Sequence, residues 1–357
     1  MNVDELLRNL LFRKFGKREI SFDFLEGLLA VCITGTGHLI RLSFETALLN
    51  WSCLIVEWYL AFASAVLVWR YTGSRKKALG TYAVLLILPT IVAEGAILGG
   101  NACVGALFFV CALLFLGQSP DKGNAWLFTV TMAVLLLWSV RYIGIVFACM
   151  LLWKNGRLRA EQLLLLLAAG GVRFVYAYRV WLPAKYTLVT FHWPNIYEFV
   201  GKEAVQGQLI DPIAMVGLFL TPGLMLLSVW LFGQNTAGLS KNAAFERWEM
   251  TAKDSAVLLR LFLFFGLAAG YLLPYMDQSC GYLYCVLAVL YFMVEPGEFL
   301  VPLLLQIVAY AGYQECFNKV SMMSMTIFSM IQLLVIGWLG IRLLDDTGVL
   351  KRCRKTS

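Results

Sequence analysis

Three polar residues near the end of the first apolar stretch are spaced to share one helical face. His38, Arg41 and Glu45 follow one another at intervals of three and four residues, and such residues lie on one side of a helix. An arginine there can hold an anion such as a phosphate, and a carboxylate or imidazole can accept a proton from a hydroxyl group. The same spacing suits an Arg41–Glu45 ion pair that only stabilises the helix end, so both interpretations stay open.

Further ionisable side chains lie in or beside apolar stretches. Arg141 interrupts the run Ala125–Trp153, Glu94 lies shortly before Asn101, and Asp277 follows an apolar segment. Because a charge at membrane depth costs several kcal/mol, each one is a candidate for function. Arg141 can bind a phosphate or extend to the outer membrane surface. Glu94 and Asp277 can each act as a general base, or serve as polar partners inside a bundle.

A long polar and aromatic interval separates two apolar stretches at 183–210 and contains Phe191-His192-Trp193-Pro194-Asn195-Ile196-Tyr197. We expect this loop to lie on the outer face of a membrane. Its substrate-binding candidates are His192, Trp193, Asn195 and Tyr197. Aromatic packing at the level of the lipid headgroups is the alternative interpretation.

The composition indicates that lipid is the solvent for most of the chain. Hydrophobic residues make up 60% of the 357 residues and charged residues 14%, which excludes an ordinary water-soluble domain. Apolar stretches of membrane-spanning length recur through 22–344. We therefore predict an all-α polytopic transmembrane bundle of about 10–12 spans, preceded by an amphipathic surface helix at 1–21 and followed by a basic tail at 345–357.

The basic residues predict the orientation. They cluster in every second join between apolar stretches, so the positive-inside rule places the N- and C-termini in the cytoplasm of a cell-membrane protein. The net charge of +7 is therefore attributed to topology rather than to nucleic-acid binding. The nine cysteines lack the paired spacing of a metal site, and most lie in apolar runs, so we expect neither a zinc site nor a disulfide framework.

The run Ala125–Trp153 is 29 residues long, more than one crossing requires. Basic residues follow it, so it must return to the cytoplasmic side. We predict two half-spans that meet near Arg141.

Several of these intervals resemble the GT-C superfamily of polytopic membrane glycosyltransferases, in particular its bacterial mannosyltransferase-like branch. The resemblance covers about residues 87–313. It rests on the interval from Glu94 to Ala102, the broken helix at Arg141, the outer-loop motif Pro194-Asn195-Ile196-Tyr197, and Leu273-Pro274-Tyr275-Met276-Asp277. The family's Gln and Asp of the first motif are Gly100 and Ala102 here, and its His-Glu-Arg of the last is Asp277-Gln278-Ser279.

The resemblance implies transfer of a sugar from a polyprenyl-phosphate donor to a cell-surface glycan or a lipid-linked acceptor. It assigns Glu45 or Asp277 as the catalytic carboxylate and Arg41 and Arg141 to the phosphate, and leaves a divalent metal undetermined. Two other functions remain open: a non-catalytic relative that binds lipid-linked glycans or scaffolds surface-polysaccharide assembly, and a transporter of such lipids.

Overall fold

The computed structural model describes residues 13–15, 18–20, 51–98, 100–116, 122–181, 190–199, 212–233, 252–318 and 324–347. Except for two strands of three residues each, the regular elements in this part are helices. The longer ones are α3 (Trp51–Thr72), α4 (Arg75–Ile87), α6 (Ala102–Leu116), α7 (Lys122–Trp138), α8 (Gly144–Lys154), α9 (Ala160–Tyr176), α11 (Pro212–Gly233), α13 (Ala252–Leu272), α14 (Cys280–Val294), α15 (Leu300–Asn318) and α16 (Met325–Asp346). Short turns of helix connect several of them: α5 (Pro89–Val92), η1 (Ala93–Ile97), η2 (Val140–Tyr142), η3 (Ala177–Trp181), η4 (Ile196–Phe199) and η5 (Pro296–Glu298).

The N-terminal segment differs from the amphipathic helix expected at 1–21. Strands β1 (Arg13–Phe15) and β2 (Arg18–Ile20) pair antiparallel, with Lys14 opposite Glu19. The helix prediction is therefore wrong for these six residues, and the rest of 1–21 lies outside the described part.

The expectation of 10–12 spans is not met in the described residues. Six helices in the described part are long and apolar enough to cross a membrane. The number becomes seven if α4 and the segment Pro89–Gly95, which are bent relative to each other, are counted together as one span. Three further apolar helices, α6, α14 and the Asn124–Trp138 part of α7, have 15 residues each, about 22 Å of helix against a hydrocarbon core of about 30 Å. Some apolar runs that look like membrane spans in the sequence thus form shorter helices that pack inside the protein. The first expected span, at 22–42, lies outside the described residues.

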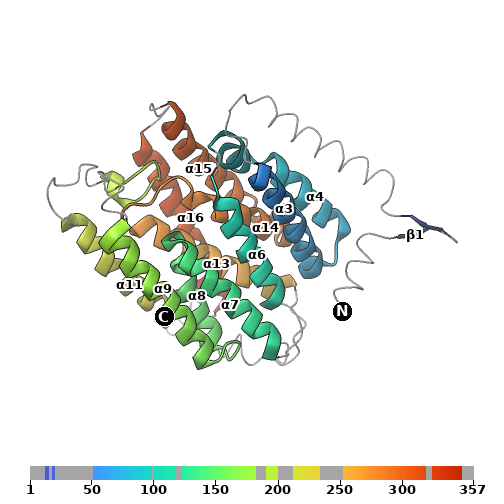
Figure 1. Cartoon of the computed structure of the whole chain (residues 1–357), viewed down its shortest axis with the longest axis horizontal. Coiled ribbons are helices and arrows are strands. Elements are labelled where there is room, and N and C mark those ends of the chain that lie inside the picture. The colour runs from blue at the N-terminus through green and yellow to red at the C-terminus, as the bar shows by residue number, and fades with distance from the viewer. Residues whose placement is uncertain are drawn as a thin grey trace, which may run out of the picture.

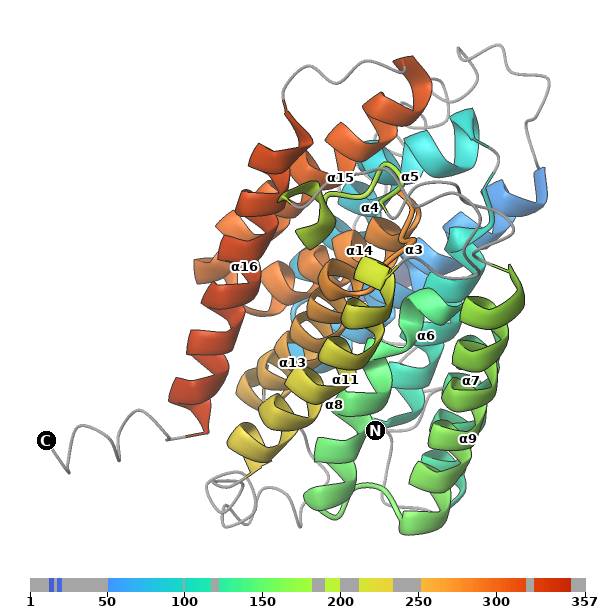
Figure 2. The same cartoon turned by 90° about the vertical axis from the view of Figure 1, so that its left-hand side faces the viewer.

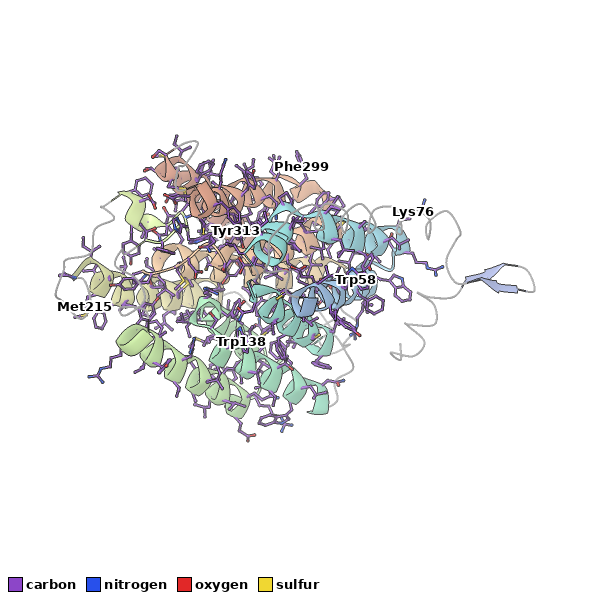
Figure 3. All side chains as sticks on the ribbon, turned by 45° about the horizontal axis from the view of Figure 1, so that its top comes forward. Trp58, Lys76, Trp138, Met215, Phe299 and Tyr313 are labelled. Carbon is purple, nitrogen blue, oxygen red and sulfur yellow. The ribbon has the colours of Figure 1, made fainter. Side chains whose placement is uncertain are left out.

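The outer surface of the bundle is apolar, as a lipid-facing surface must be. Figure 3 shows Trp58, Trp138, Met215 and Phe299 around the outside and Tyr313 within the bundle. The first four are 46 to 53% exposed, whereas Tyr313 is fully buried. Together with the six candidate spans, this surface identifies the chain as a multi-pass membrane protein.

Two helices form the centre of the bundle. α13 packs against α8, α11, α14 and α16, and α14 also contacts α3, α4, α6 and α15. Within its most apolar stretch, α13 has 89% of its residues buried inside the protein, whereas α11 has 22%. Figure 1 shows α9 and α11 on one side of this centre and α3 and α4 on the other, and in Figure 2 α11, α13 and α16 run alongside one another. Side chains at the ends of α13 and α14 are therefore held by the best-packed part of the molecule.

Basic joins gather at one end of the bundle, which we call the basic end. Tyr71, at the end of α3, lies within electrostatic reach of Arg70 and Arg157. The Lys77 ammonium donates to the carbonyl of Val294 over 3.5 Å. Joins far apart in the sequence thus meet here, as the charge pattern predicts, and the opposite ends of α13 and α14 carry a different set of polar residues.

Candidate functional site

The predicted break in the run 125–153 is confirmed. α7 ends at Trp138, Ser139 adopts an extended conformation, and its hydroxyl oxygen accepts a hydrogen bond from the Arg141 backbone N–H at 3.3 Å. α8 resumes at Gly144, where a Cβ would overlap the backbone oxygen of Phe265 in α13. Only glycine allows this close approach. Local capping and a helix contact therefore place Arg141 at a fixed point beside α13.

Arg141 forms an ion pair with Asp277, which is 136 residues away. Asp277 lies in the turn between α13 and α14, where Tyr275 has a φ of +61°, an unusual value for a bulky residue. The Tyr178 hydroxyl donates to Pro274 O in the same turn at 3.1 Å, and the Tyr284 hydroxyl donates to Arg141 O at 2.9 Å. Hydrogen bonds to backbone carbonyls thus hold both Arg141 and the turn that carries Asp277 in place. The side chains are only 18% and 7% exposed, so Arg141 forms its ion pair within the protein.

Glu94 lies beside this ion pair. It is 3% exposed and sits in η1, a π-helical turn that follows the bend at Pro89. Its carboxylate faces the side chains of Ser279 and Tyr313 and lies within electrostatic reach of Arg141 and Asp277. Single π-helical turns are frequent at functional sites. The structure thus brings Glu94, Arg141 and Asp277 together from three separate parts of the chain; we call them the polar cluster.

A third buried carboxylate, which lies beside the polar cluster, was missed by the sequence analysis. Glu57 in α3 is 2% exposed, and its carboxylate lies where a Cβ on Gly95 would be. It also acts electrostatically on Cys103, while the Cys53 thiol donates to Gly100 O at 3.3 Å. Its signal in the sequence is an acidic residue within the apolar run 48–69. The polar cluster is therefore bordered by a further acid, Glu57, on the α3 side.

Gly100 provides a test of this packing. A Cβ at residue 100 would overlap the carboxylate of Glu94. We expect Gly100→Ala to lower stability by about 1–3 kcal/mol, because a buried carboxylate must leave its place. Gly171→Ala is the matched control, since a Cβ there meets nothing within 4 Å and alanine favours a helix by roughly 0.8–1.0 kcal/mol over glycine. Thermal unfolding in detergent measures both, and equal unfolding temperatures would contradict the placement of Glu94.

The loop candidates form a packed plug against the ends of the central helices. Trp193 is 1% exposed, and its indole lies against Gly270 of α13 and Gly281 of α14. Asn195 Oδ1 accepts from the Tyr197 backbone N–H at 3.1 Å. The Tyr197 hydroxyl donates to Leu272 O at 2.8 Å. These side chains fasten the segment 190–199 onto the helix ends that hold Asp277.

His192 lies at the margin of the polar cluster. It has a φ of +56°, and its Nδ1 is 3.4 Å from Glu315 Oε2 in α15. Cys316, which follows Glu315 in α15, is within electrostatic reach of Glu315, Glu94 and Asp277. Asn101 is exposed one residue before α6. His192 is thus near the cluster, whereas the side chain of Asn101 faces outward.

The remaining site candidates, His38, Arg41 and Glu45, lie outside the described residues. Within the described part, no group of three or more His, Cys, Asp or Glu side chains could hold a metal ion. The chemistry available to the polar cluster therefore depends on the Arg141 guanidinium and its neighbouring carboxylates. Such a set binds a phosphate and accepts a proton from a hydroxyl group.

A second polar group, also missed by the sequence analysis, lies near the basic end. Arg260 in α13 is 3% exposed and pairs with Asp346 and, at 2.9 Å, with Glu295. Its Nε donates to the Tyr291 hydroxyl at 2.8 Å. Tyr291 lies in the last turn of α14, Glu295 follows that helix, and Asp346 ends α16. Because the guanidinium is saturated with protein partners, we assign it a structural role.

Comparisons with protein families, with characterised proteins and with solved structures found no match to this chain.

Proposed function

We propose that this protein is a membrane glycosyltransferase that moves a sugar from a polyprenyl-phosphate donor to a cell-surface glycan or a lipid-linked acceptor. The observation that supports this most is the Arg141–Asp277 pair at a broken helix, with Glu94 beside it. A guanidinium in a low-dielectric site stabilises the charge that develops on a departing phosphate. The motif resemblance at 94–102, 194–197 and 273–277 points to the same chemistry.

In this proposal Arg141 holds the phosphate of the leaving polyprenyl phosphate. A carboxylate removes the proton from the attacking hydroxyl group, and the oxygen then forms the bond to the sugar carbon as the bond to phosphate breaks. Asp277 and Glu45 are the two candidates for that base. Asp277 also orients Arg141, so an arriving phosphate that pairs with Arg141 frees the Asp277 carboxylate to accept a proton.

The membrane orientation belongs to the same proposal. The basic end carries Arg70, Lys77 and Arg157, so it faces the cytoplasm by the positive-inside rule. The polar cluster lies at the other ends of α13 and α14, toward the outer leaflet. Both termini are then cytoplasmic, and the lipid-linked donor and acceptor meet the protein from outside the cell.

A second function is favoured by the ion pair itself. Asp277 is already engaged by Arg141, so its carboxylate is occupied in an ion pair. A protein that binds a lipid-linked glycan without transferring its sugar, or that scaffolds surface-polysaccharide assembly, needs only the anion-binding part of the cluster.

Reconstitution in liposomes separates the two functions. We expect the purified protein to release polyprenyl phosphate from one member of a panel of polyprenyl-phosphate hexoses. Asp277→Asn or Glu45→Gln, whichever carboxylate is the base, lowers that release by about 10²–10⁴-fold while donor binding persists. Binding without release in the wild-type protein supports the second function. Absence of both binding and release from every donor contradicts the two proposals together.

A further inference from the structure

The plug, which comprises residues 190–199, is fastened to several helices. Its Trp193 packs against Gly270 of α13, and the Ser329 hydroxyl of α16 donates to Asn195 O at 2.7 Å. Figure 2 shows part of the plug in yellow-green close to α15 and α16. These contacts join uncharged groups. The contact with α15 is different, because it brings a histidine to a carboxylate.

His192 touches α15 at two points that are one helical turn apart. A Cβ on Gly312 would overlap the backbone oxygen of His192, so glycine is required for this approach. Three residues further along the same face, Oε2 of Glu315 lies 3.4 Å from the buried Nδ1 of His192. The ring of Phe191 lies against the imidazole, with 4.3 Å between the ring centroids. His192 has a φ of +56°, a conformation in which histidine and asparagine are more frequent than most residues. Backbone and ring contacts thus direct the imidazole at Glu315.

This arrangement favours the protonated imidazole. Nδ1 then donates to a carboxylate of opposite charge, whereas without a proton it would place its lone pair against another acceptor. The side chain of His192 is 24% exposed and that of Glu315 is 19% exposed, so protons from solution reach the pair while water screens it only in part. Imidazoles change charge between about pH 5 and 8. Because protonation and contact formation are linked, the contact stabilises the plug at low pH and weakens as the pH rises through that range.

Other titratable groups lie around the pair. On α15, Cys316 follows Glu315, and it is within electrostatic reach of Glu94 and Asp277. Within the plug, Glu198 Oε1 accepts a hydrogen bond from the Thr190 hydroxyl at 3.1 Å. A pH response that comes from these groups persists when the histidine is replaced, which separates them from the pair.

The pair also adjoins the polar cluster. A Cβ on Gly312 would lie 3.7 Å from Cβ of Gln278, the residue that follows Asp277, as well as against the plug. The plug, α15 and the turn that carries Asp277 therefore meet at this point.

We propose that His192 and Glu315 form a pH-sensitive latch. The protonated imidazole fastens the plug to α15 beside the turn that carries Asp277, and loss of the proton loosens it. In the proposed orientation this end of the bundle faces outward, so the pH outside the cell operates the latch. The latch depends on the pair alone and holds whether or not the polar cluster transfers a sugar.

Hydrogen exchange of the purified protein in detergent tests the latch. Mass spectrometry measures it at about pH 5.5 and about pH 8, on either side of the imidazole range, with correction for the intrinsic effect of pH on amide exchange. We expect the amides of 190–199 to be about fivefold better protected at the lower pH, as a partly exposed ion pair allows, and those of α13 to be unchanged. His192→Asn keeps a residue that tolerates the positive φ but removes the titrating group. This variant and Glu315→Gln are expected to show the same, low protection of 190–199 at both pH values.

Glu198→Gln is the matched control. It removes a carboxylate from the same segment, at a side chain that bonds to Thr190, and is expected to keep the pH response. Equal protection of the wild-type plug at both pH values overturns the proposal. A response that survives His192→Asn or Glu315→Gln, or that disappears in Glu198→Gln, assigns the effect to other groups and overturns it as well. None of these outcomes bears on the transfer reaction, which is measured by donor release in liposomes.

Discussion

Replacing Arg141 with glutamine is expected to abolish polyprenyl phosphate release and to destabilise the bundle at the same time. Asp277 is 7% exposed at its side chain, so loss of Arg141 leaves a nearly buried carboxylate without its ion-pair partner. Breaking such a pair from one side costs about 3–5 kcal/mol. The unfolding temperature in detergent and the donor turnover in liposomes measure the two effects.

The double variant Arg141→Gln/Asp277→Asn separates structure from chemistry. It removes both charges and leaves two neutral amides that can hydrogen-bond to each other, so we expect it to regain most of the lost stability. Turnover stays absent, because neither the phosphate ligand nor the carboxylate is restored. Full turnover in the double variant would show that the pair only supports the fold, and the proposed transfer mechanism would then be wrong.

Replacing Trp193 with alanine is expected to cost about 3–5 kcal/mol of stability. The indole is 1% exposed and fills the space beside Gly270 and Gly281, so its removal leaves a cavity between α13 and α14. The segment 190–199 then loses its main apolar anchor. A large fall in unfolding temperature and faster proteolysis within 190–199 are the measurements.

Trp138→Ala is the matched control for that prediction. Trp138 is 46% exposed on the outer surface (Figure 3). We expect it to change stability by less than about 1 kcal/mol, because detergent or lipid replaces the lost contacts. If both tryptophan variants unfold at the same temperature, then Trp193 is not the anchor of the segment.

The tertiary contacts also explain why a change at Trp193 is expected to have a larger effect than a change at Trp138. Trp193, Tyr197 and Asn195 bond to or pack against the ends of α13, α14 and α16, and the Ser329 hydroxyl donates to Asn195 O at 2.7 Å. The plug and the turn that carries Asp277 therefore share supports. Damage to the plug is expected to reach the Arg141–Asp277 pair, whereas a change on the lipid-facing surface is not.

The sequence by itself determined the solvent and the local geometry of this protein. Sixty per cent hydrophobic residues require lipid around the helices, and a run too long for one crossing that contains Ser139-Val140-Arg141 requires a break there. Both properties follow from nearest neighbours along the chain, since helix capping, burial cost and charge in a join act over one or two turns. The gathering of basic joins at one end follows from the same local pattern.

Only the tertiary structure decided which polar residues meet. Arg141 and Asp277 are 136 residues apart, and no local rule pairs them. Glu57 enters the neighbourhood of Glu94 only because α3 crosses at Gly95. The 15-residue helices α6 and α14 looked like membrane spans in the sequence because burial against protein and burial in lipid select the same apolar side chains. Trp193 resembled a lipid-interface aromatic for the same reason, until the close approach of two glycines showed that it fills the core.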